Sequence, residues 1–272
     1  MDIHITEIKK DKSVTLLARA GLIAKGFVYC TSGLLALMAA LHIGNESSKE
    51  ADSSGVLYFL NDSSVGSWLL PLLALGLLCY SVWRFTEAYQ HTKGSNKDWK
   101  KAARYILSGL AYVLLALSAI KIVLDKDKKG GDSQQAFAGE LLSKPFGQWL
   151  LGIAAVIIAG IGIYQVYYGL SEKYRKHVQN MSLHTKHANL MLGAGKIGYV
   201  ARGIVWLIIG YLMMQAAIAS SSSQAGDSGE AFSFIEQSPM GKYLLAALGV
   251  GLIGYGCFNF IRARYENFKE HN

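Results

Sequence analysis

The stretch GLIAKGFVY, Gly21 to Tyr29, returns near the C-terminus as GYVARGIVW, Gly198 to Trp206. Both stretches read Gly-x-x-Ala-basic-Gly-x-Val-aromatic. Between them RYILSGLAY, Arg104 to Tyr112, keeps the second glycine and the final aromatic residue. A pattern that recurs in this way indicates a chain built from copies of one structural unit.

Two glycines mark each copy, and the interval between them is nearly constant. The first anchor glycine lies inside the repeated stretch, and the second begins the pattern Gly-x-aromatic-Leu-Leu. The first anchors are Gly26, Gly109 and Gly203, and the second anchors are Gly66, Gly147 and Gly241. We predict one domain over residues 1–272, with repeat units at about 17–92, 99–176 and 193–268.

Each unit contains two long apolar segments. Of the 272 residues, 51% are hydrophobic and 17% are charged, whereas a soluble domain carries about 25% charged residues. Six windows are nearly free of charge, and each is long enough to span the roughly 30 Å hydrocarbon core as a helix. The windows are 20–43, 66–83, 105–120, 147–170, 203–220 and 243–261. The sequence therefore predicts an all-α integral membrane protein with six transmembrane helices.

The net charge of +8 is distributed unevenly between the two sides of the predicted membrane. The termini and two of the connecting segments hold 20 Lys and Arg against 8 Asp and Glu, whereas the alternating loops hold 7 against 11. This asymmetry is the positive-inside pattern, and it predicts that both termini are cytoplasmic. Since topology accounts for the basic residues, no nucleic-acid partner is expected.

The predicted units share one orientation in the membrane. Two helices per unit return the chain to its starting side, so the three hairpins are parallel repeats and not inverted ones. A closed pseudo-threefold bundle is the simplest packing, and a linear arrangement is the alternative.

The loops between the two helices of a unit also repeat. An Asp-Ser pair stands at nearly the same distance before each second anchor and is followed by a short apolar stretch. Aspartate before an apolar run is typical of a helix N-cap, because its carboxylate accepts hydrogen bonds from free backbone N–H groups. We predict a short amphipathic helix at the outer interface of each unit. Its caps would be Asp52, Asp132 and Asp227.

Four basic residues lie near the cytoplasmic ends of the predicted spans: Lys25, Arg84, Arg202 and Arg262. One interpretation is a basic ring that binds an anion or a lipid headgroup. The alternative is that these residues determine topology and reach lipid phosphates from the ends of their helices. Bound phospholipid is expected under either interpretation.

Polar residues recur at equivalent positions of the units. Arg84, Gln165 and Asn259 stand at the same offset from the second anchors Gly66, Gly147 and Gly241. Ser108 occupies the place that Lys25 and Arg202 take in the outer units. Such side chains either line a pathway or hydrogen-bond to a neighbouring helix and hold the repeats together.

Residues typical of enzymes and of cofactor sites are missing from the predicted spans. The sequence contains no phosphate-binding glycine loop, no Gly-x-Ser-x-Gly and no His-Glu-x-x-His. Cys30, Cys79 and Cys257 lie in different spans, far apart in register, and are expected to be small apolar packing residues. We expect no catalytic residue, no metal and no cofactor.

The repeated pattern, the run PFGQWLL from Pro145 to Leu151 and the Gly- and Tyr-rich second helices resemble a known family. It is the multi-pass membrane family catalogued as domain of unknown function 1206, in which a pair of transmembrane helices occurs three times. The resemblance covers about Leu17 to Phe268 and implies a bacterial-type plasma membrane protein, without an activity. The middle unit departs from the pattern at Ser108 and at Arg104, which replaces the glycine of Gly21 and Gly198.

Three classes of function remain compatible with the sequence. A non-enzymatic scaffold or accessory subunit of a membrane assembly, or of a homo-oligomer, is favoured because the spans carry few polar residues. A channel or facilitator for a small solute or ion along the pseudo-threefold axis is the alternative. An enzyme acting on lipid is disfavoured, because no nucleophile or acid–base pair is apparent.

Overall fold

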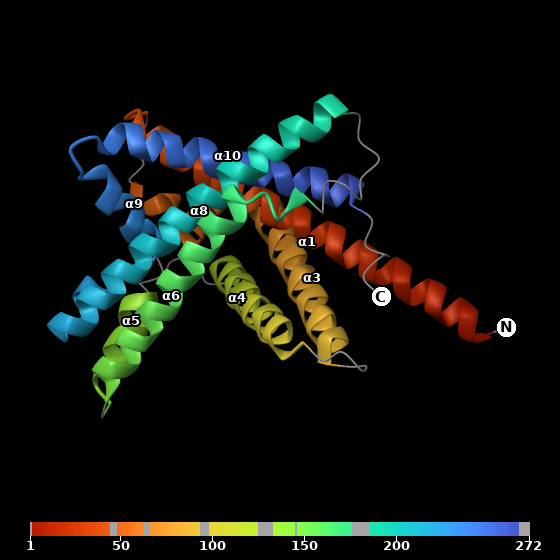
Figure 1. Ribbon diagram of the computed structural model, residues 1–272, viewed down its shortest axis with the longest axis horizontal. Helices are drawn as coiled ribbons and strands as arrows, with labels where there is room; N and C mark the ends of the chain where they lie inside the picture. Colours follow the sequence, from red (N-terminus) through yellow and green to blue (C-terminus); the bar gives the residue numbers. More distant parts are fainter. Residues whose placement is uncertain are drawn as a thin grey trace.

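The computed structural model of the protein describes residues 2–43, 48–62, 66–92, 98–124, 133–144, 146–175 and 185–266. Within these ranges all regular structure is helical (Figure 1). The long helices are α1 (Asp2–Ala40), α3 (Gly66–Thr92), α4 (Trp99–Leu124), α6 (Gly147–Leu170), α8 (Thr185–Ala219) and α10 (Gly241–Tyr265). The shorter helices are η1 (Ser48–Ala51), α2 (Ser53–Asp62), α5 (Ser133–Leu142), η2 (Ser222–Gln224) and α9 (Ser228–Glu236).

All six long helices are apolar and long enough to cross a membrane, which confirms the predicted spans. The helices extend beyond the charge-poor windows, above all at the starts of α1 and α8. The polar segments before these windows contain no proline and many Lys, Leu and Ala residues, so they continue the helix. α1 begins and α10 ends at the same end of the molecule (Figure 1).

The closest helix packing joins different units. α3 packs on α4, α6 packs on α8, and α10 packs on α1 (Figure 1). The second helix of each unit therefore lies against the first helix of the next unit, and the third unit returns to the first. In the first and third units the two helices of the unit also pack on each other, α1 on α3 and α8 on α10.

The first anchor glycines lie at these three contacts between units. The Ser81 hydroxyl on α3 donates a hydrogen bond of 2.9 Å to the Gly109 carbonyl on α4. Gly162 and Gly256 occupy the position of Ser81 in the other units. A Cβ atom added to them would come within 2.9 Å of the Gly203 carbonyl and 2.6 Å of the Gly26 carbonyl. Small residues are needed here because the two backbones almost touch.

Close contact within a unit depends on a different glycine. A Cβ atom added to Gly21 would lie 2.5 Å from the Cα of Tyr80, and one added to Gly198 would lie 2.7 Å from the Cα of Tyr255. Tyr80 and Tyr255 are themselves equivalent, because they stand at the same offset from the second anchors of their units. The first and third units thus use the same glycine–tyrosine contact to bring their two helices together.

The middle unit lacks both members of this contact. Arg104 stands in place of the glycine and Ile161 in place of the tyrosine. Along their described residues α4 and α6 do not pack on each other as the helix pairs of the other units do. The long Arg104 side chain cannot fit where the other units bring two backbones into contact, so the two helices of this unit are separated.

The second anchor glycines begin α3, α6 and α10 directly after a short helix. A Cβ atom added to Gly66, Gly147 or Gly241 would lie 1.8 to 1.9 Å from a carbonyl oxygen in the last turn of that helix. Any larger residue would push the short helix away from the span that follows it.

An apolar core lies between α1, α3, α4, α8 and α10, in the half of the molecule that carries the short helices. Its fully buried members include Leu35, Leu77 and Ala116, and it continues to the short helices through Leu57 and Phe232. The expectation that the three cysteines lie far apart is wrong for one pair. α1 packs on α10, and the Cys30 thiol donates a hydrogen bond of 3.7 Å to the Ile253 carbonyl, about one turn before Cys257.

Candidate functional site

Two basic residues of the bundle interior lie among tyrosines. We call this group the cage: Lys25 and Tyr29 of α1, Tyr80 of α3, Tyr112 of α4, Arg202 of α8 and Tyr255 of α10. Five of the six long helices contribute to it. Its members lie either close to a first anchor or, for Tyr80 and Tyr255, at one fixed offset from a second anchor. The repeat geometry therefore brings them to one level of the bundle.

Lys25 is the centre of the cage and only 5% exposed. Its ammonium donates a hydrogen bond of 3.2 Å to the Tyr80 hydroxyl. It also lies 5.1, 5.5 and 5.3 Å from the ring centres of Tyr80, Tyr112 and Tyr255. Three aromatic faces around one ammonium offset part of the cost of removing the charge from water.

Arg202 occupies the equivalent position in the third unit and makes the equivalent contact. Its guanidinium donates a hydrogen bond of 2.5 Å to the Tyr255 hydroxyl. It lies 4.5 Å from the Tyr255 ring and 4.9 Å from the Tyr29 ring. Within the described part of the chain, the Nε atom of Arg202 is buried without a hydrogen-bond partner. The cage therefore holds a donor that its own side chains leave unused.

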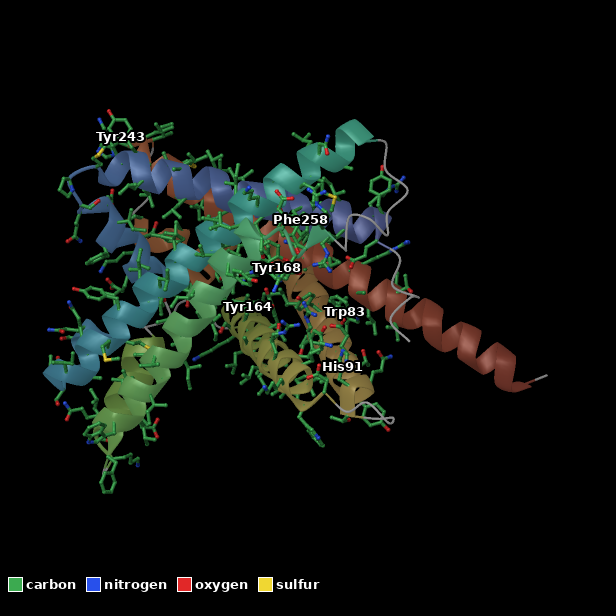
Figure 2. The ribbon with its side chains drawn as sticks, in the orientation of Figure 1. Trp83, His91, Tyr164, Tyr168, Tyr243 and Phe258 are labelled. Atoms are coloured by element: carbon green, nitrogen blue, oxygen red, sulfur yellow. The ribbon has the colours of Figure 1, made fainter. Side chains whose placement is uncertain are left out.

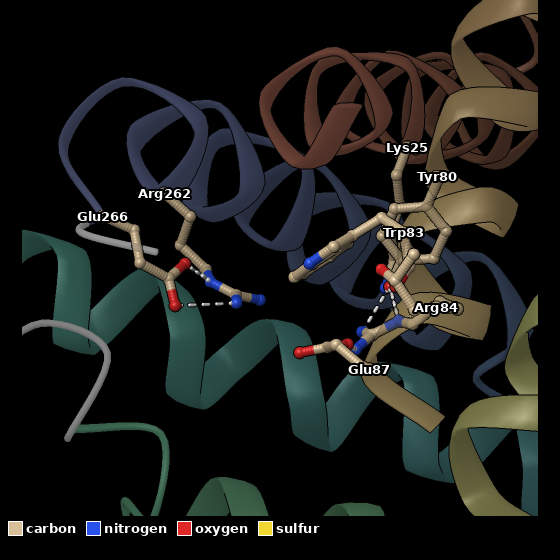
Figure 3. A network of polar contacts seen from close by, with 8 residues as sticks. Lys25, Tyr80, Trp83, Arg84, Glu87, Arg262 and Glu266 are labelled. Atoms are coloured by element: carbon tan, nitrogen blue, oxygen red, sulfur yellow. Dashed lines mark hydrogen bonds and ion pairs between the residues drawn. The ribbon is translucent and has the colours of Figure 1, made fainter. Parts of the chain in front are cut away.

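Arg84 and Arg262 flank the cage and have acidic partners on their own helices or directly after them (Figure 3). Arg84 pairs with Glu87 at 2.6 Å and donates from Nε to the Tyr80 hydroxyl at 2.9 Å. Arg262 pairs with Glu266 at 2.6 Å, and both side chains are almost fully buried. These two cations are neutralised locally.

The balance of charge in this region is positive. Four basic side chains gather there, and two of them have carboxylate partners. No carboxylate within the described part of the chain forms an ion pair with Lys25 or Arg202. Burying charges without a counterion is costly, so the arrangement favours an anion next to the cage.

The recurrent polar positions have different partners. Arg84 belongs to the ion pair just described, whereas Asn259 donates to the Tyr255 carbonyl of its own helix at 2.7 Å. The Oδ1 atom of Asn259 and the Oε1 atom of Gln165 are buried without a partner among the described residues. Ser108 is half-buried on α4.

The predicted outer caps are far from the cage along the helices. Asp52 accepts hydrogen bonds from the backbone of Ser54 at 3.1 Å and Gly55 at 2.6 Å, at the start of α2. Asp227 accepts from Gly229 at 2.8 Å and Glu230 at 3.1 Å, at the start of α9. Asp132 lies outside the described residues.

Asp52 and Asp227 also act on each other. Burial raises the pKa of the Asp52 carboxyl to about 7, and the nearby charge of Asp227 contributes to this rise, against the lowering effect of the backbone hydrogen bonds. The contact between η1 and α9 that brings them together includes a Lys49–Glu230 ion pair of 2.8 Å and a hydrogen bond from Ser48 to Glu236.

The tyrosines are the part of the site that the sequence analysis did not identify. Tyr80 and Tyr255 recur at one fixed distance from the second anchors, and this recurrence was the available signal. The rings continue from Tyr255 to Tyr199 at 5.1 Å and from there to Tyr168 of α6 at 4.9 Å. Figure 2 shows Tyr168 and Tyr164 on the part of α6 near the centre of the molecule.

These features define the class of protein. It is a multi-pass helical membrane protein assembled from three helix pairs, with no grouping of three His, Cys, Asp or Glu side chains that could hold a metal among its described residues.

Comparison with known proteins gives the family. Residues 20–91, 103–172 and 197–266 each match the family described as Domain of Unknown Function (DUF1206), so the chain belongs to this family and carries its domain three times. The chain is also similar to the uncharacterized protein YxxB of Bacillus subtilis (strain 168). The two are 28% identical over 271 residues, which is 98% of this chain and 97% of YxxB. No solved structure matches.

Proposed function

We propose that this protein is a non-enzymatic accessory subunit or scaffold of a bacterial-type plasma membrane, and that it holds an anionic group in its cage. The observation that carries the proposal is the pair of interior cations, Lys25 and Arg202, whose hydrogen bonds go to tyrosines and not to carboxylates. Such a pair is stable when an external anion supplies the missing charge.

The arrangement of the units supports a scaffold. Three equivalent contacts, at Gly26, Gly109 and Gly203, join each unit to the next and the last to the first. We infer a ring of three parallel hairpins with pseudo-threefold symmetry. The symmetry is distorted in the middle unit, because α4 and α6 do not pack on each other. A ring of this kind holds its centre rigidly, because each unit is fixed on two sides.

The channel alternative has less support. A pathway along the axis would pass from the cage into the apolar core, where Leu35 and Leu77 are fully buried. Arg84, Gln165 and Asn259 would also have to converge on that axis, whereas Asn259 bonds to its own helix. Packed apolar side chains leave no polar groups to replace the hydration shell of an ion.

Native mass spectrometry after gentle extraction tests the proposal. We expect the wild-type protein to carry an anionic species that the double variant Lys25→Met/Arg202→Met loses. The matched control is Lys101→Met/Arg175→Met, which removes two exposed cations and should keep the species. A wild-type chain without any anionic species, or a double variant that keeps it, would contradict anion binding.

The same spectra test the accessory role. A second protein in fixed stoichiometry supports it, and a population made only of single chains contradicts it.

A further inference from the structure

Because α4 and α6 of the middle unit do not pack on each other, a stripe of α4 is exposed whose equivalent in the first unit is buried. In the first unit Gly21, Ala24, Val28 and Leu35 of α1 are all buried. Their equivalents on α4 are Arg104, Leu107, Ala111 and Ser118, and all four are exposed. Positions three and four apart share one helix face, so this is a continuous surface along α4.

The opposite helix is exposed in the same way. Ile157 of α6 stands where the other units have Gly76 and Gly251, and Ile161 stands where they have a tyrosine. The two isoleucines are 56% and 38% exposed. Only 22% of the apolar window in each of α4 and α6 is buried, against 39 to 56% in the other spans. Exposed apolar side chains therefore lie on both helices, Leu107 and Ala111 on α4 and Ile157 and Ile161 on α6, and the α4 stripe also carries Arg104 and Ser118 at its ends.

This separation borders the cage. Tyr112, which faces Lys25, belongs to α4, and Tyr168, which continues the ring contacts of the cage, belongs to α6. Towards the inner end Arg104 of α4 donates a hydrogen bond of 3.3 Å to the Tyr164 hydroxyl of α6. A molecule between the two helices would thus meet apolar walls on its outer side and basic and phenolic donors on its inner side.

We propose that one anionic glycerophospholipid enters sideways between α4 and α6, with its phosphate beside Lys25 and Arg202 and its acyl chains along the exposed stripe. The proposal rests on the proposed function, because it assigns the anion of the cage to a lipid. Charge complementarity selects the headgroup, and the apolar walls accept the chains. The basic residues sit toward the predicted cytoplasmic side, so the lipid comes from that leaflet.

The phosphate also fits the donors that are present. The unused Nε of Arg202 and the Lys25 ammonium are both donors, and an oxyanion accepts several such hydrogen bonds at once. The middle unit contributes no cation at the position of Ser108. The site therefore has two cation–tyrosine pairs, and in this proposal the lipid approaches them from the side of the middle unit.

Photo-crosslinking in vesicles tests the lipid. A benzophenone amino acid replaces Leu107, in the separation, or Val250, an exposed residue of α10 that faces away from the protein. The vesicles contain phosphatidylglycerol and phosphatidylcholine in equal amounts. We expect phosphatidylglycerol adducts at position 107 to be enriched about tenfold, since about 1.4 kcal/mol of preference is tenfold. Adducts at position 250 should follow the vesicle composition, and Lys25→Met/Arg202→Met should remove the enrichment.

A second measurement separates this inference from the proposed function. Inorganic phosphate or glycerol phosphate is added to the purified protein in neutral detergent, and its melting temperature is compared with that of the double variant. Equal adduct ratios at positions 107 and 250, with stabilisation by free phosphate, overturn the lipid and leave anion binding in place. Equal ratios without any stabilisation overturn both.

Discussion

Tyr80 shows how one hydroxyl can organise several charges inside a membrane protein. The side chain is fully buried, and its oxygen accepts hydrogen bonds from Lys25 and from Arg84. Because both donors are cations, the hydroxyl provides electron density to Arg84 in addition to Glu87, and to Lys25 in place of a carboxylate. The same role falls to Tyr255 beside Arg202.

Replacing Tyr80 by phenylalanine isolates this contribution. We expect Tyr80→Phe to destabilise the protein by about 1.5–3 kcal/mol, the usual range for hydrogen bonds to charged groups. Thermal unfolding in neutral detergent measures the loss. Tyr243→Phe is the control, because Tyr243 is 63% exposed. An equal melting temperature for both variants would show that the hydroxyl is dispensable.

The raised pKa of Asp52 predicts that the stability of the protein depends on pH, through the contact between η1 and α9. Its pKa is raised from 3.8 to about 7 by burial and by Asp227, so the folded protein binds this proton more tightly than the unfolded chain does. Stability should therefore fall as the pH rises from about 4 to about 7, by at most about 1.4 kcal/mol per unit of pH. Asp52→Asn keeps an N-cap residue, removes the charge and should abolish the slope.

The measurement for Asp52 is the melting temperature at several pH values between these limits. Asp52→Asn should be more stable than the wild type at the upper limit and nearly equal to it at the lower one. A wild-type protein whose stability rises with pH over this range would contradict the prediction.

At the scale of helices, a glycine allows the two helices of a unit to touch. Gly198 lies against the backbone of Tyr255, and its equivalent in the middle unit is Arg104. Gly198→Leu should separate α8 from α10 and cost about 1–3 kcal/mol, as overpacking usually does. Gly193→Leu on the same helix is the control, since nothing lies within 4 Å of the added Cβ.

Thermal unfolding compares the two leucine variants. Gly193→Leu should be neutral or slightly stabilising, because glycine is a poor helix former. If both variants melt at the same temperature, the contact between Gly198 and Tyr255 does not hold the helices together.

The sequence predicted the helices better than their contacts. Charge-poor windows located the six spans, and the recurrent Asp-Ser pairs pointed to the short helices α2, α5 and α9. The departure at Arg104 was also visible. Its consequence was not, because that depends on Ile161, which is distant in sequence and ordinary by itself. The cage was missed for the same reason: a tyrosine gains its role from the cations that other helices bring to it.

At the scale of the whole molecule, the charge distribution predicts the orientation. Both termini should be cytoplasmic, because the segments on their side carry 20 Lys and Arg against 8 Asp and Glu. A fluorescent protein fused to the C-terminus should fold and fluoresce, and alkaline phosphatase fused there should be inactive. The reverse result would place the cage near the outer leaflet and remove the proposed source of its lipid.

Closure of the three units into a ring depends on the contact between α1 and α10, and the protein contains its own probe of that contact. Cys30 of the first span donates a hydrogen bond to the Ile253 carbonyl of the last span, about one turn before Cys257. In an open row of units α1 and α10 would lie at opposite ends.

We expect a short bis-maleimide or mild oxidation to join Cys30 to Cys257 within one chain, and peptide mass spectrometry to identify the link. Cys79 on α3 is the internal control, since it should remain unlinked. A link only between chains, or none, would mean that the units form an open row and that the cage is not enclosed.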